Sequence, residues 1–379
     1  MAKRSIFEEV TEAQKPLPAG GMIDANKGRG RDAARRWLVV IFLLVAAMIL
    51  VGGLTRLTDS GLSITEWRPV TGALPPMGEA AWQAEFSKYQ ASPEFMLQNS
   101  HMDLAAFKSI YWWEWGHRQL GRVIGLVWAF GYVGLALTRR IPAGWAPRFL
   151  LLGLLGGLQG AIGWWMVSSG LSGKAVDVAS YRLAIHLGLA FLILGLTGWF
   201  ILSLGRSEAV LLQARRQKEE RLFRMTTGLM HLTFLQILLG ALVAGIDAGR
   251  AFPTWPLMGD SFFPADAFYV PDGGSSLRAF FENPGLVQFM HRVAGYLVVI
   301  LAFLVWRRAR ASAHRATRAA FDLVTLMVLA QVALGIVTVL QSAPIHLGFL
   351  HQLGAIVLFT LILRARHRAA YPLAQSLRD

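Results

Sequence analysis

The sequence predicts an all-α integral membrane protein with eight transmembrane helices, arranged as two pseudo-symmetric four-helix bundles. Three observations lead to this class: an apolar composition, uncharged blocks of membrane-spanning length, and a repeat that relates the two halves of the chain. Of the 379 residues, 54% are hydrophobic and only 16% are charged. This leaves too little polar surface to cover a soluble globule, so the solvent of much of the chain must be lipid.

Uncharged or nearly uncharged stretches recur along the chain, close to the roughly 20 residues that a helix needs to cross the hydrocarbon core. They lie at about 37–55, 117–138, 149–171, 183–205, 225–246, 288–306, 323–341 and 347–363. Each stretch is expected to form one transmembrane helix.

The segments between these stretches complete the predicted organisation. Residues 1–36 are polar and basic and lack the short apolar core of a signal peptide, so they are expected to form a cytoplasmic N-terminal tail. The expected segments after the tail are a first bundle over 37–205, a cytoplasmic linker over 206–224, a second bundle over 225–365 and a cytoplasmic C-terminal tail over 366–379.

The basic residues are concentrated on one side of the predicted membrane. The N-terminal tail, the connections after Thr138, Gly205 and Trp306, and the C-terminal end hold 26 of the 37 Lys and Arg residues. By the positive-inside rule, we expect both termini of this multi-pass protein to be cytoplasmic and segments 56–113 and 247–287 to be outside. The net charge of +14 is thereby explained by orientation in lipid, and no nucleic acid partner is expected.

An internal repeat relates the two halves. The block MILVGGLTRLTDSG in the first stretch corresponds to QILLGALVAGIDAG in the fifth. Three more pairs follow in the same order: HRQLGRVIG at 117–125 with HRVAGYLVV at 291–299, QGAIG at 159–163 with QVALG at 331–335, and HLGLA at 186–190 with HQLGA at 351–355. Each half has an even number of helices, so the two units are expected to be parallel repeats about an axis along the membrane normal.

Four histidines fall at matched positions of this repeat, one pair in each half, near the outer ends of their predicted helices: His117, His186, His291 and His351. Two imidazoles that approach from facing helices at one depth can ligate haem iron from both sides. A small residue follows each histidine by four positions, on the same helix face, where a porphyrin could lie. These residues are Gly121, Ala190, Gly295 and Ala355.

For any one histidine, the alternative is a hydrogen bond between helices, with the small residue permitting close packing. The matched set of four favours haem, because ionisable groups inside a membrane are costly and usually functional. Zero cysteines exclude thiolate ligation and disulfides. The other five histidines are expected to be structural or solvated: His101, His231, His314, His346 and His367.

Basic and amide residues surround the predicted haem ligands. Arg118 and Arg292 directly follow two of the histidines, and Arg122 lies one turn further on; these guanidinium groups could pair with haem propionates. The alternative is that they anchor the helices at the membrane interface. Three glutamines that each precede a glycine by four positions are expected to form hydrogen bonds between helices: Gln159, Gln236 and Gln331.

One acidic residue breaks the symmetry of the repeat. Glu114 precedes His117 by three residues and so lies on nearly the same helix face, whereas the second half has Gln288 at that position. A carboxylate here could deliver protons during an oxidation. The alternative is a salt bridge from Glu114 to Arg118, one helical turn away.

Longer blocks of the sequence resemble the haem A synthase family, in its alphaproteobacterial and mitochondrial type. The blocks are GGLTRLTDSGLSITEWRPVTGALPP at 52–76, IYWWEWGHRQLGRVIG at 110–125, the stretch from LQGAIGWWMVSSGL to YRLAIHLGLA at 158–190, and GALVAGIDAGRAFPTWPLMGDSFFP at 240–264. With the later histidine motifs they span about 40–365. The cysteine pair in the outer loops of certain bacterial members is absent here, which excludes thiol-based transfer of electrons or haem.

The resemblance implies that this protein oxidises a methyl group of haem O to a formyl group, giving haem A for cytochrome oxidase. It implies that His291 and His351 hold a haem b cofactor and that His117 and His186 receive haem O as substrate. Oxidising the methyl group requires activated oxygen, which histidine-ligated iron supplies only if a coordination position opens. In the substrate half, one coordination position of the iron must therefore be able to open. Glu114 is expected to take part in catalysis there.

The same resemblance implies three kinds of partner: haem O synthase, cytochrome oxidase assembly factors, and an electron donor that the sequence does not identify. The histidines by themselves leave two other functions open. One is a dihaem b-type electron-transfer membrane cytochrome, which does not alter its haem. The other is a non-catalytic haem carrier. Only the enzyme changes the porphyrin covalently, so this change distinguishes it from the cytochrome and from the carrier.

Overall fold

In the computed structural model, which describes residues 22–171, 173, 176–270 and 274–374, eight helices are long and apolar enough to cross a membrane. They are α1 (Met22–Leu57), α4 (Leu104–Leu137), α5 (Ala146–Val167), α6 (Ser180–Leu204), α8 (Glu220–Gly245), α10 (Pro284–Arg310), α11 (Arg315–Leu340) and α12 (Ile345–Ala370). The predicted all-α membrane class is confirmed. Residues 1–21 and 375–379 of the predicted tails lie outside the described residues.

Several helices begin before the uncharged stretches that predicted them. Helix α4 begins at Leu104, where the side chain of Asp103 accepts a hydrogen bond from the Ala106 N–H at 2.8 Å. Helix α10 begins at Pro284, where Asn283 accepts in the same way from the Leu286 N–H at 2.9 Å. Such caps satisfy the free N–H groups in the first turn of a helix. A capped helix can therefore begin in polar surroundings, several residues before the uncharged stretch that crosses the hydrocarbon core.

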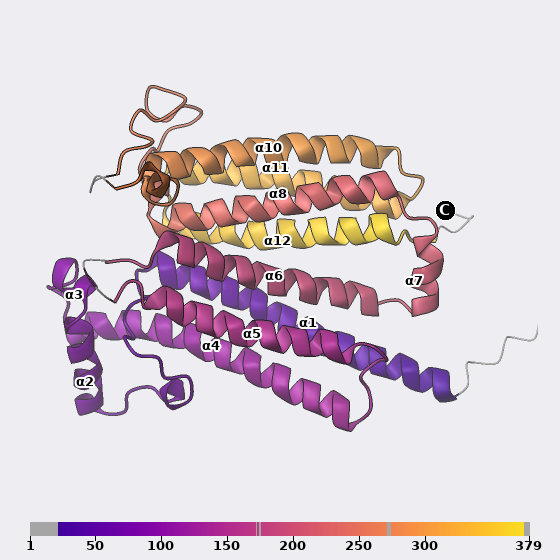
Figure 1. The fold of residues 1–379 in the computed structure, drawn as a ribbon, viewed down its shortest axis with the longest axis horizontal. Helices are drawn as coiled ribbons and strands as arrows, with labels where there is room; N and C mark the ends of the chain where they lie inside the picture. Colours follow the sequence, from indigo (N-terminus) through magenta and orange to yellow (C-terminus); the bar gives the residue numbers. More distant parts are fainter. Residues whose placement is uncertain (1–21, 172, 174–175, 271–273, 375–379) are drawn as a thin grey trace, which may run out of the picture.

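The connections also contain short helices. The segment after α1 contains the 3₁₀ turn η1 (Thr71–Ala73) and helices α2 (Glu79–Gln90) and α3 (Pro93–Leu97). The predicted linker contains α7 (Glu208–Arg215), and the segment before α10 contains η2 (Ala248–Arg250), η3 (Ser276–Arg278) and α9 (Ala279–Glu282). In Figure 1, α2 and α3 lie at one end of the long helices and α7 lies at the other.

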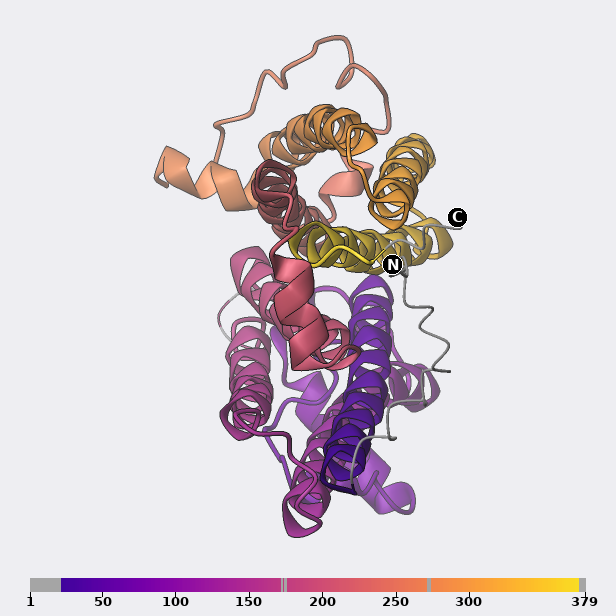
Figure 2. The same ribbon diagram turned by 90° about the vertical axis from the view of Figure 1, so that its right-hand side faces the viewer.

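The long helices pack in two groups, visible in both ribbon views (Figures 1 and 2). One group is α1, α4, α5 and α6, and the other is α8, α10, α11 and α12. In the first group α4 and α6 each pack against α1 and α5, and in the second α10 and α12 each pack against α8 and α11. The two helices that carry each histidine pair are therefore diagonal to one another across their group.

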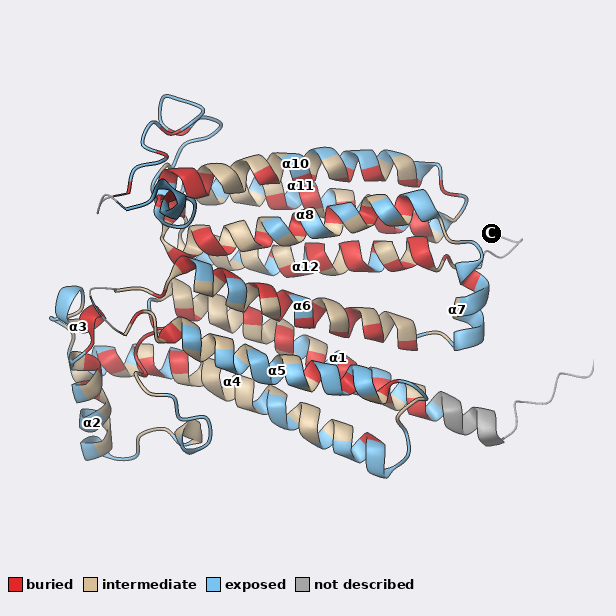
Figure 3. Cartoon of the chain, viewed as in Figure 1, coloured by how far each residue is buried: buried red, intermediate tan, exposed pale blue. Residues whose placement is uncertain are grey.

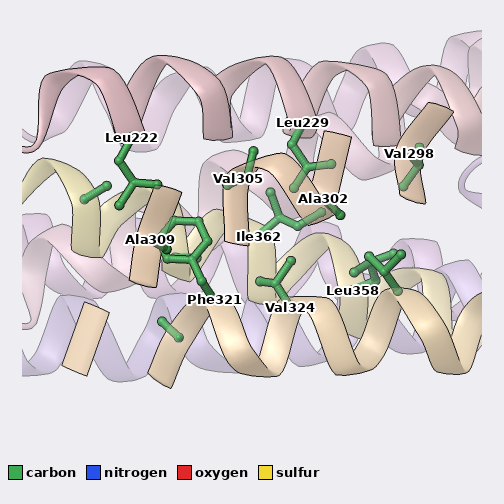
Figure 4. Close-up of a cluster of buried hydrophobic side chains, with 14 residues drawn as sticks. Leu222, Leu229, Val298, Ala302, Val305, Ala309, Phe321, Val324, Leu358 and Ile362 are labelled. Carbon is green, nitrogen blue, oxygen red and sulfur yellow. The ribbon is translucent and has the colours of Figure 1, made fainter. Parts of the chain in front are cut away.

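The groups meet along α1, α6, α8 and α12 through an apolar cluster that includes Ile41, Ile49, Phe191, Leu194, Ile237, Ile356 and Phe359. Helix α6 is the most deeply buried of the eight, whereas few residues of α4 and α5 are buried (Figure 3). A second cluster fills the α8–α12 group at the end away from its histidines, with side chains such as Leu222, Val305, Phe321 and Ile362 (Figure 4). The histidine pairs are thus built on a rigid, well-packed scaffold.

A charged cluster joins the two groups at the end that carries α2 and α3. Arg56, in the last turn of α1, contacts Asp59 at 2.6 Å, Asp247 at 3.0 Å and Asp177 at 3.5 Å. Asp247 follows α8, so this guanidinium connects the first group to the second. Asp59 and Asp247 occupy matched positions of the sequence repeat, and both have a left-handed backbone, with φ of 47° and 50°.

Candidate functional site

In the second group, the two predicted ligands face each other across the helices. His291 lies on α10 and His351 on α12, and their ring centroids are 6.5 Å apart with an interplanar angle of 73°. A metal–imidazole bond is about 2 Å long, the value known for zinc. Two such bonds, with the distance from nitrogen to ring centroid on either side, come to about the observed separation. These two side chains therefore fit a metal ion held between them.

In the first group, His117 lies on α4 and His186 on α6, on the corresponding diagonal helices. A glycine of the neighbouring helix lies beneath each of these rings. A Cβ built on Gly52 would lie 3.0 Å from Nε2 of His117, and one built on Gly163 would lie 2.9 Å from Cε1 of His186. Any larger residue at these glycines would displace the imidazole.

The second group repeats this arrangement. A Cβ on Gly240 would lie 3.1 Å from Cε1 of His291, and one on Gly335 would lie 3.2 Å from Cε1 of His351. The sequence predicts a role for the small residues that follow the histidines on their own helices, and the contacts of these four glycines with the imidazoles were not predicted. A signal for them is present in the sequence, because each lies in a matched block of the repeat, four residues after Met48, Gln159, Gln236 or Gln331.

The glutamines form the hydrogen bonds between helices that the sequence predicted. Gln159 Nε2 donates to the backbone oxygen of His186, Gln236 Nε2 to that of His291, and Gln331 Nε2 to that of His351, each at 3.0 Å. The amide oxygens of all three are buried and accept no hydrogen bond from the described residues. These amides therefore hold the main chain of three predicted ligands and also leave acceptors directed into the helix groups.

Glu114 is buried and fully hydrogen-bonded. Its Oε1 accepts from Arg118 Nη2 at 2.6 Å and from Nε at 3.0 Å, and its Oε2 accepts from Ser63 Oγ and the Ile64 N–H, both at 2.7 Å. The salt bridge to Arg118 is thus present. The carboxylate also fastens the segment after α1 to α4, one turn from His117.

Gln288 has the matching place in the second group with different chemistry. Its Oε1 accepts from Arg292 Nη2 at 2.8 Å, and its Nε2 donates to the Ala248 carbonyl at 2.8 Å. Where Glu114 accepts from a backbone N–H, Gln288 donates to a backbone C=O. The residue type is therefore matched to the loop above it, and the two side chains are not interchangeable.

The three arginines predicted to bind propionates donate to loop carbonyls in this structure. Arg118 donates to Glu66 O at 2.9 Å and Ile64 O at 2.8 Å, and Arg122 donates to the carbonyls of residues 68 and 69. Arg292 donates to the carbonyls of residues 252, 254 and 257. The guanidinium groups thus hold the loops over both histidine pairs, and their pairing with propionates remains a prediction.

A pocket of 410 Å³ opens beside these arginines in the first group. Its lining includes Arg118, Arg122, Ile64 and Tyr111, and it extends to the segment before α2. The pocket lies next to the Glu114–Arg118 pair, at the end of the group that carries the outer segments.

The remaining histidines lie apart from the two pairs. His101, His231 and His346 are exposed, and His231 Nδ1 lies 2.8 Å from the Thr227 carbonyl on its own helix. His314 precedes α11, and His367 is buried edge-on against Trp199 with ring centroids 5.1 Å apart. These positions agree with structural or solvated roles.

The residues present fit haem. Four imidazoles on two diagonal helix pairs supply the axial donors, glycine backbones keep the rings in place, and the Nδ1 of His351 is buried without a partner in the described structure. Fold and site together define a class: an eight-helix membrane protein with a pair of haem-ligand candidates in each half.

Comparison with known proteins identifies the family. Residues 35–363 match the family described as "Cytochrome oxidase assembly protein". The chain is 62% identical to the heme A synthase of Paracoccus denitrificans over 380 residues, covering 100% of this chain and 99% of the relative. It is also 59% identical to the heme A synthase of Ruegeria sp. TM1040 over 382 residues, with 100% of both chains covered, and 61% identical to that of Cereibacter sphaeroides over 383 residues. The chain belongs to this family of cytochrome oxidase assembly proteins.

Proposed function

We propose that this protein carries out the haem A synthase reaction with a fixed division of labour between its two helix groups. The reaction oxidises haem O to haem A and serves cytochrome oxidase assembly, so the protein is an oxidoreductase. The observation that carries the division is the asymmetry at one matched position, Glu114 in the first group against Gln288 in the second. At this matched position an ionisable carboxylate lies near the first histidine pair and an amide, which does not exchange protons near neutral pH, lies near the second.

The second group is the cofactor side in this proposal. His291 and His351 hold haem b between diagonal helices, with Arg292 over it from the outer side. Bound haem supplies electron transfer where both histidines stay ligated and oxygen activation where one position opens. The hydrogen bonds from Gln236 and Gln331 to the backbone oxygens of both ligands support a permanently ligated role for this pair.

The first group is the substrate side. His117 and His186 receive haem O. With activated oxygen as the oxidant, its methyl carbon loses two hydrogens and gains one oxygen, and the activation of oxygen takes up protons that must be delivered to the site. Glu114 lies one turn from His117 and is connected to the outer pocket through Arg118, which lines it. A carboxylate in this place can exchange protons between the reacting group and the outer surface once its bond to Arg118 loosens.

The protein spans the membrane many times. We place it in the bacterial inner membrane with both termini in the cytoplasm, because the basic residues gather at the α7 end of the helices. A reporter fused after residue 90, between α2 and α3, should report the outer side. A cytoplasmic signal from that fusion would invert the orientation and remove the argument for an outer entrance. Haem O synthase, which makes the substrate, is the partner that this proposal favours.

The function is tested by extracting and separating the haems bound to the purified protein from cells that make haem O. Haem B together with haem O or haem A is expected. Haem B alone in such cells would favour the electron-transfer cytochrome. Haem O that binds and exchanges without ever being oxidised would favour the carrier.

A further inference from the structure

The four predicted haem ligands differ in how their main chain is held. The backbone oxygen of His186, His291 and His351 each accepts a hydrogen bond from a glutamine of the neighbouring helix at 3.0 Å. Among the described residues, no side chain donates to the backbone oxygen of His117. One ligand of the four therefore lacks an attachment that the other three share.

The residue that replaces the missing glutamine is Met48. In the repeat, Met48 on α1 corresponds to Gln236 on α8. The contacts agree: a Cβ built on Gly295 would lie 3.4 Å from Gln236 Nε2, and one built on Gly121 would lie 3.3 Å from Met48 Cε. Met48 thus fills the same space as the glutamine and offers a thioether, which cannot donate a hydrogen bond to the carbonyl.

The helix that carries His117 is also packed less tightly than the helix that carries His291. Helix α4 contacts α5 much less than its counterpart α10 contacts α11. A Cβ added to the adjacent Gly116, or to Gly125 two turns further on, would meet nothing within 4 Å. Methionine is flexible and adapts to changes in its surroundings. The turn of α4 that carries His117 consequently has space to move, and no side chain of the described residues fastens its carbonyl.

We propose that Gln159, Gln236 and Gln331 are positioning residues that fix three of the ligands, and that Met48 leaves His117 as the ligand free to withdraw. The inference rests on the proposed function, namely that these histidines bind haem iron. Of the two first-group ligands, His117 is the one expected to leave the iron and His186 the one expected to stay. The difference is one hydrogen bond to the backbone oxygen of the ligand, present at His186 and, among the described residues, absent at His117.

Exchange of the two residues tests the proposal. The full-length purified protein is loaded with haem, reduced, and exposed to carbon monoxide, which binds only where an axial ligand leaves. The wild-type protein should bind it at the first-group haem. Met48→Gln should slow this binding about five- to ten-fold, the factor expected for one hydrogen bond. Gln236→Met should give the second-group haem a carbon monoxide signal that the wild type lacks.

A matched control is available in Gln352, whose Nε2 donates at 2.8 Å to the Ile49 carbonyl, which belongs to no ligand. Gln352→Met removes the same type of bond and should leave carbon monoxide binding unchanged. Equal binding rates in the wild type and Met48→Gln, with no new signal in Gln236→Met, would overturn the proposal, as would an equal effect of Gln352→Met.

The low-spin electron paramagnetic resonance signals of the oxidised protein provide a second readout. Met48→Gln should reduce the linewidth of the first-group signal, because the geometry of its ligand becomes more uniform. Gln236→Met should increase the linewidth of the second-group signal for the opposite reason. If Met48→Gln does not fold, Gln236→Met alone decides. Wild-type protein that binds no haem would instead contradict the proposed function, so the two failures are distinguishable.

Discussion

The first helix group carries Glu114 where the second carries Gln288, and Met48 where the second carries Gln236. Around these two differences the groups are alike: each has two histidines on diagonal helices, a glycine beneath each ring, and an arginine that fastens the loop above. A shared scaffold thus supports two sites whose chemistry differs through a few side chains. The first site gains a carboxylate and loses a hydrogen bond, both of which suit a site that must change during turnover.

The outer ends of the groups differ as well. Above the first group lie α2 and α3, with a mainly aromatic hydrophobic cluster formed by Ile64, Phe86, Tyr89, Phe107 and Tyr111. The segment above the second group has less helix. The pocket beside Arg118 lies under this cap. The pocket beside Arg118 and the carboxylate of Glu114 both belong to the first group, which agrees with the proposal that this group receives the substrate.

The largest expected effect comes from replacing the ligands one at a time by methionine. His291→Met or His351→Met should abolish most of the b-type absorbance of the purified protein, because each removes a donor from the permanently ligated pair. His117→Met or His186→Met should retain that absorbance and lower haem A formation by at least an order of magnitude, consistent with the loss of a substrate ligand. Absorbance spectra and chromatography of extracted haems measure the two outcomes. Equal loss of absorbance in all four folded variants would remove the division between the groups.

The next effect concerns Glu114→Gln, which should lower haem A formation by about 100-fold if the carboxylate exchanges protons. An amide cannot reproduce every hydrogen bond of this carboxylate, because all four partners are donors. The Nε2 group of the glutamine would face the Ile64 N–H, donor against donor, so the outer segment should loosen. Haem content and haem A are measured together.

Two matched variants separate catalysis from anchoring at this position. Ser63→Ala removes one bond to the carboxylate at 2.7 Å and leaves the charge and its pairing with Arg118. It should cost much less activity than Glu114→Gln. Gln288→Glu, the reverse exchange in the second group, should not affect proton exchange in the first. A comparable loss in Ser63→Ala would reduce Glu114 to a structural anchor.

A pH dependence of stability is expected from the cap over the first group. Burial raises the pKa of Glu94 to about 8, and the negative charges of Asp177 and Asp59 add to this shift. Between the unfolded value of 4.5 and about 8, the folded protein holds a proton that the unfolded chain has lost, so stability falls as pH rises through this window. The difference amounts to a few kcal/mol, since one unit of pKa is worth about 1.4 kcal/mol.

Thermal unfolding in detergent between pH 5 and pH 9 measures this effect. Glu94→Gln should remove most of the slope and raise the Tm at high pH, because an amide does not ionise. The second group provides the comparison, since Glu282 in its short helix α9 is exposed and pairs with Arg278 at 2.7 Å, whereas Glu94 is buried. An unchanged slope in Glu94→Gln would show that other groups govern the pH dependence.

The smallest effect is expected from Arg118→Lys and Arg292→Lys. A lysine cannot reproduce the fork that donates to several carbonyls, so each loop loses part of its attachment. The Tm should fall by about 2–4 °C for each kcal/mol lost. Arg118→Lys should be the more costly, because it leaves the buried Glu114 with a poorer partner. A shift of the haem potential without a change in Tm would favour the predicted pairing with propionates over loop anchoring.

The sequence by itself determined the class of fold, the number of long apolar helices and the matched positions of the four histidines. A transmembrane helix satisfies its own backbone hydrogen bonds, so its existence is a local property that length and composition report. The contrast between Glu114 and Gln288 was visible for the same reason, because the repeat aligns residues on the same face of matched helices.

The tertiary structure decided what these residues contact. That Gln236 is bonded to the carbonyl of His291 while Met48 leaves His117 without such a bond, and that Arg118 holds a loop, depends on the rotation and depth of one helix against another. The hydropathy of a transmembrane helix reports neither its rotation nor its depth relative to a neighbour, since lipid-facing and helix-facing residues are both mainly apolar. The ends of α4 and α10 were likewise set by capping in polar surroundings, beyond the reach of the apolar pattern.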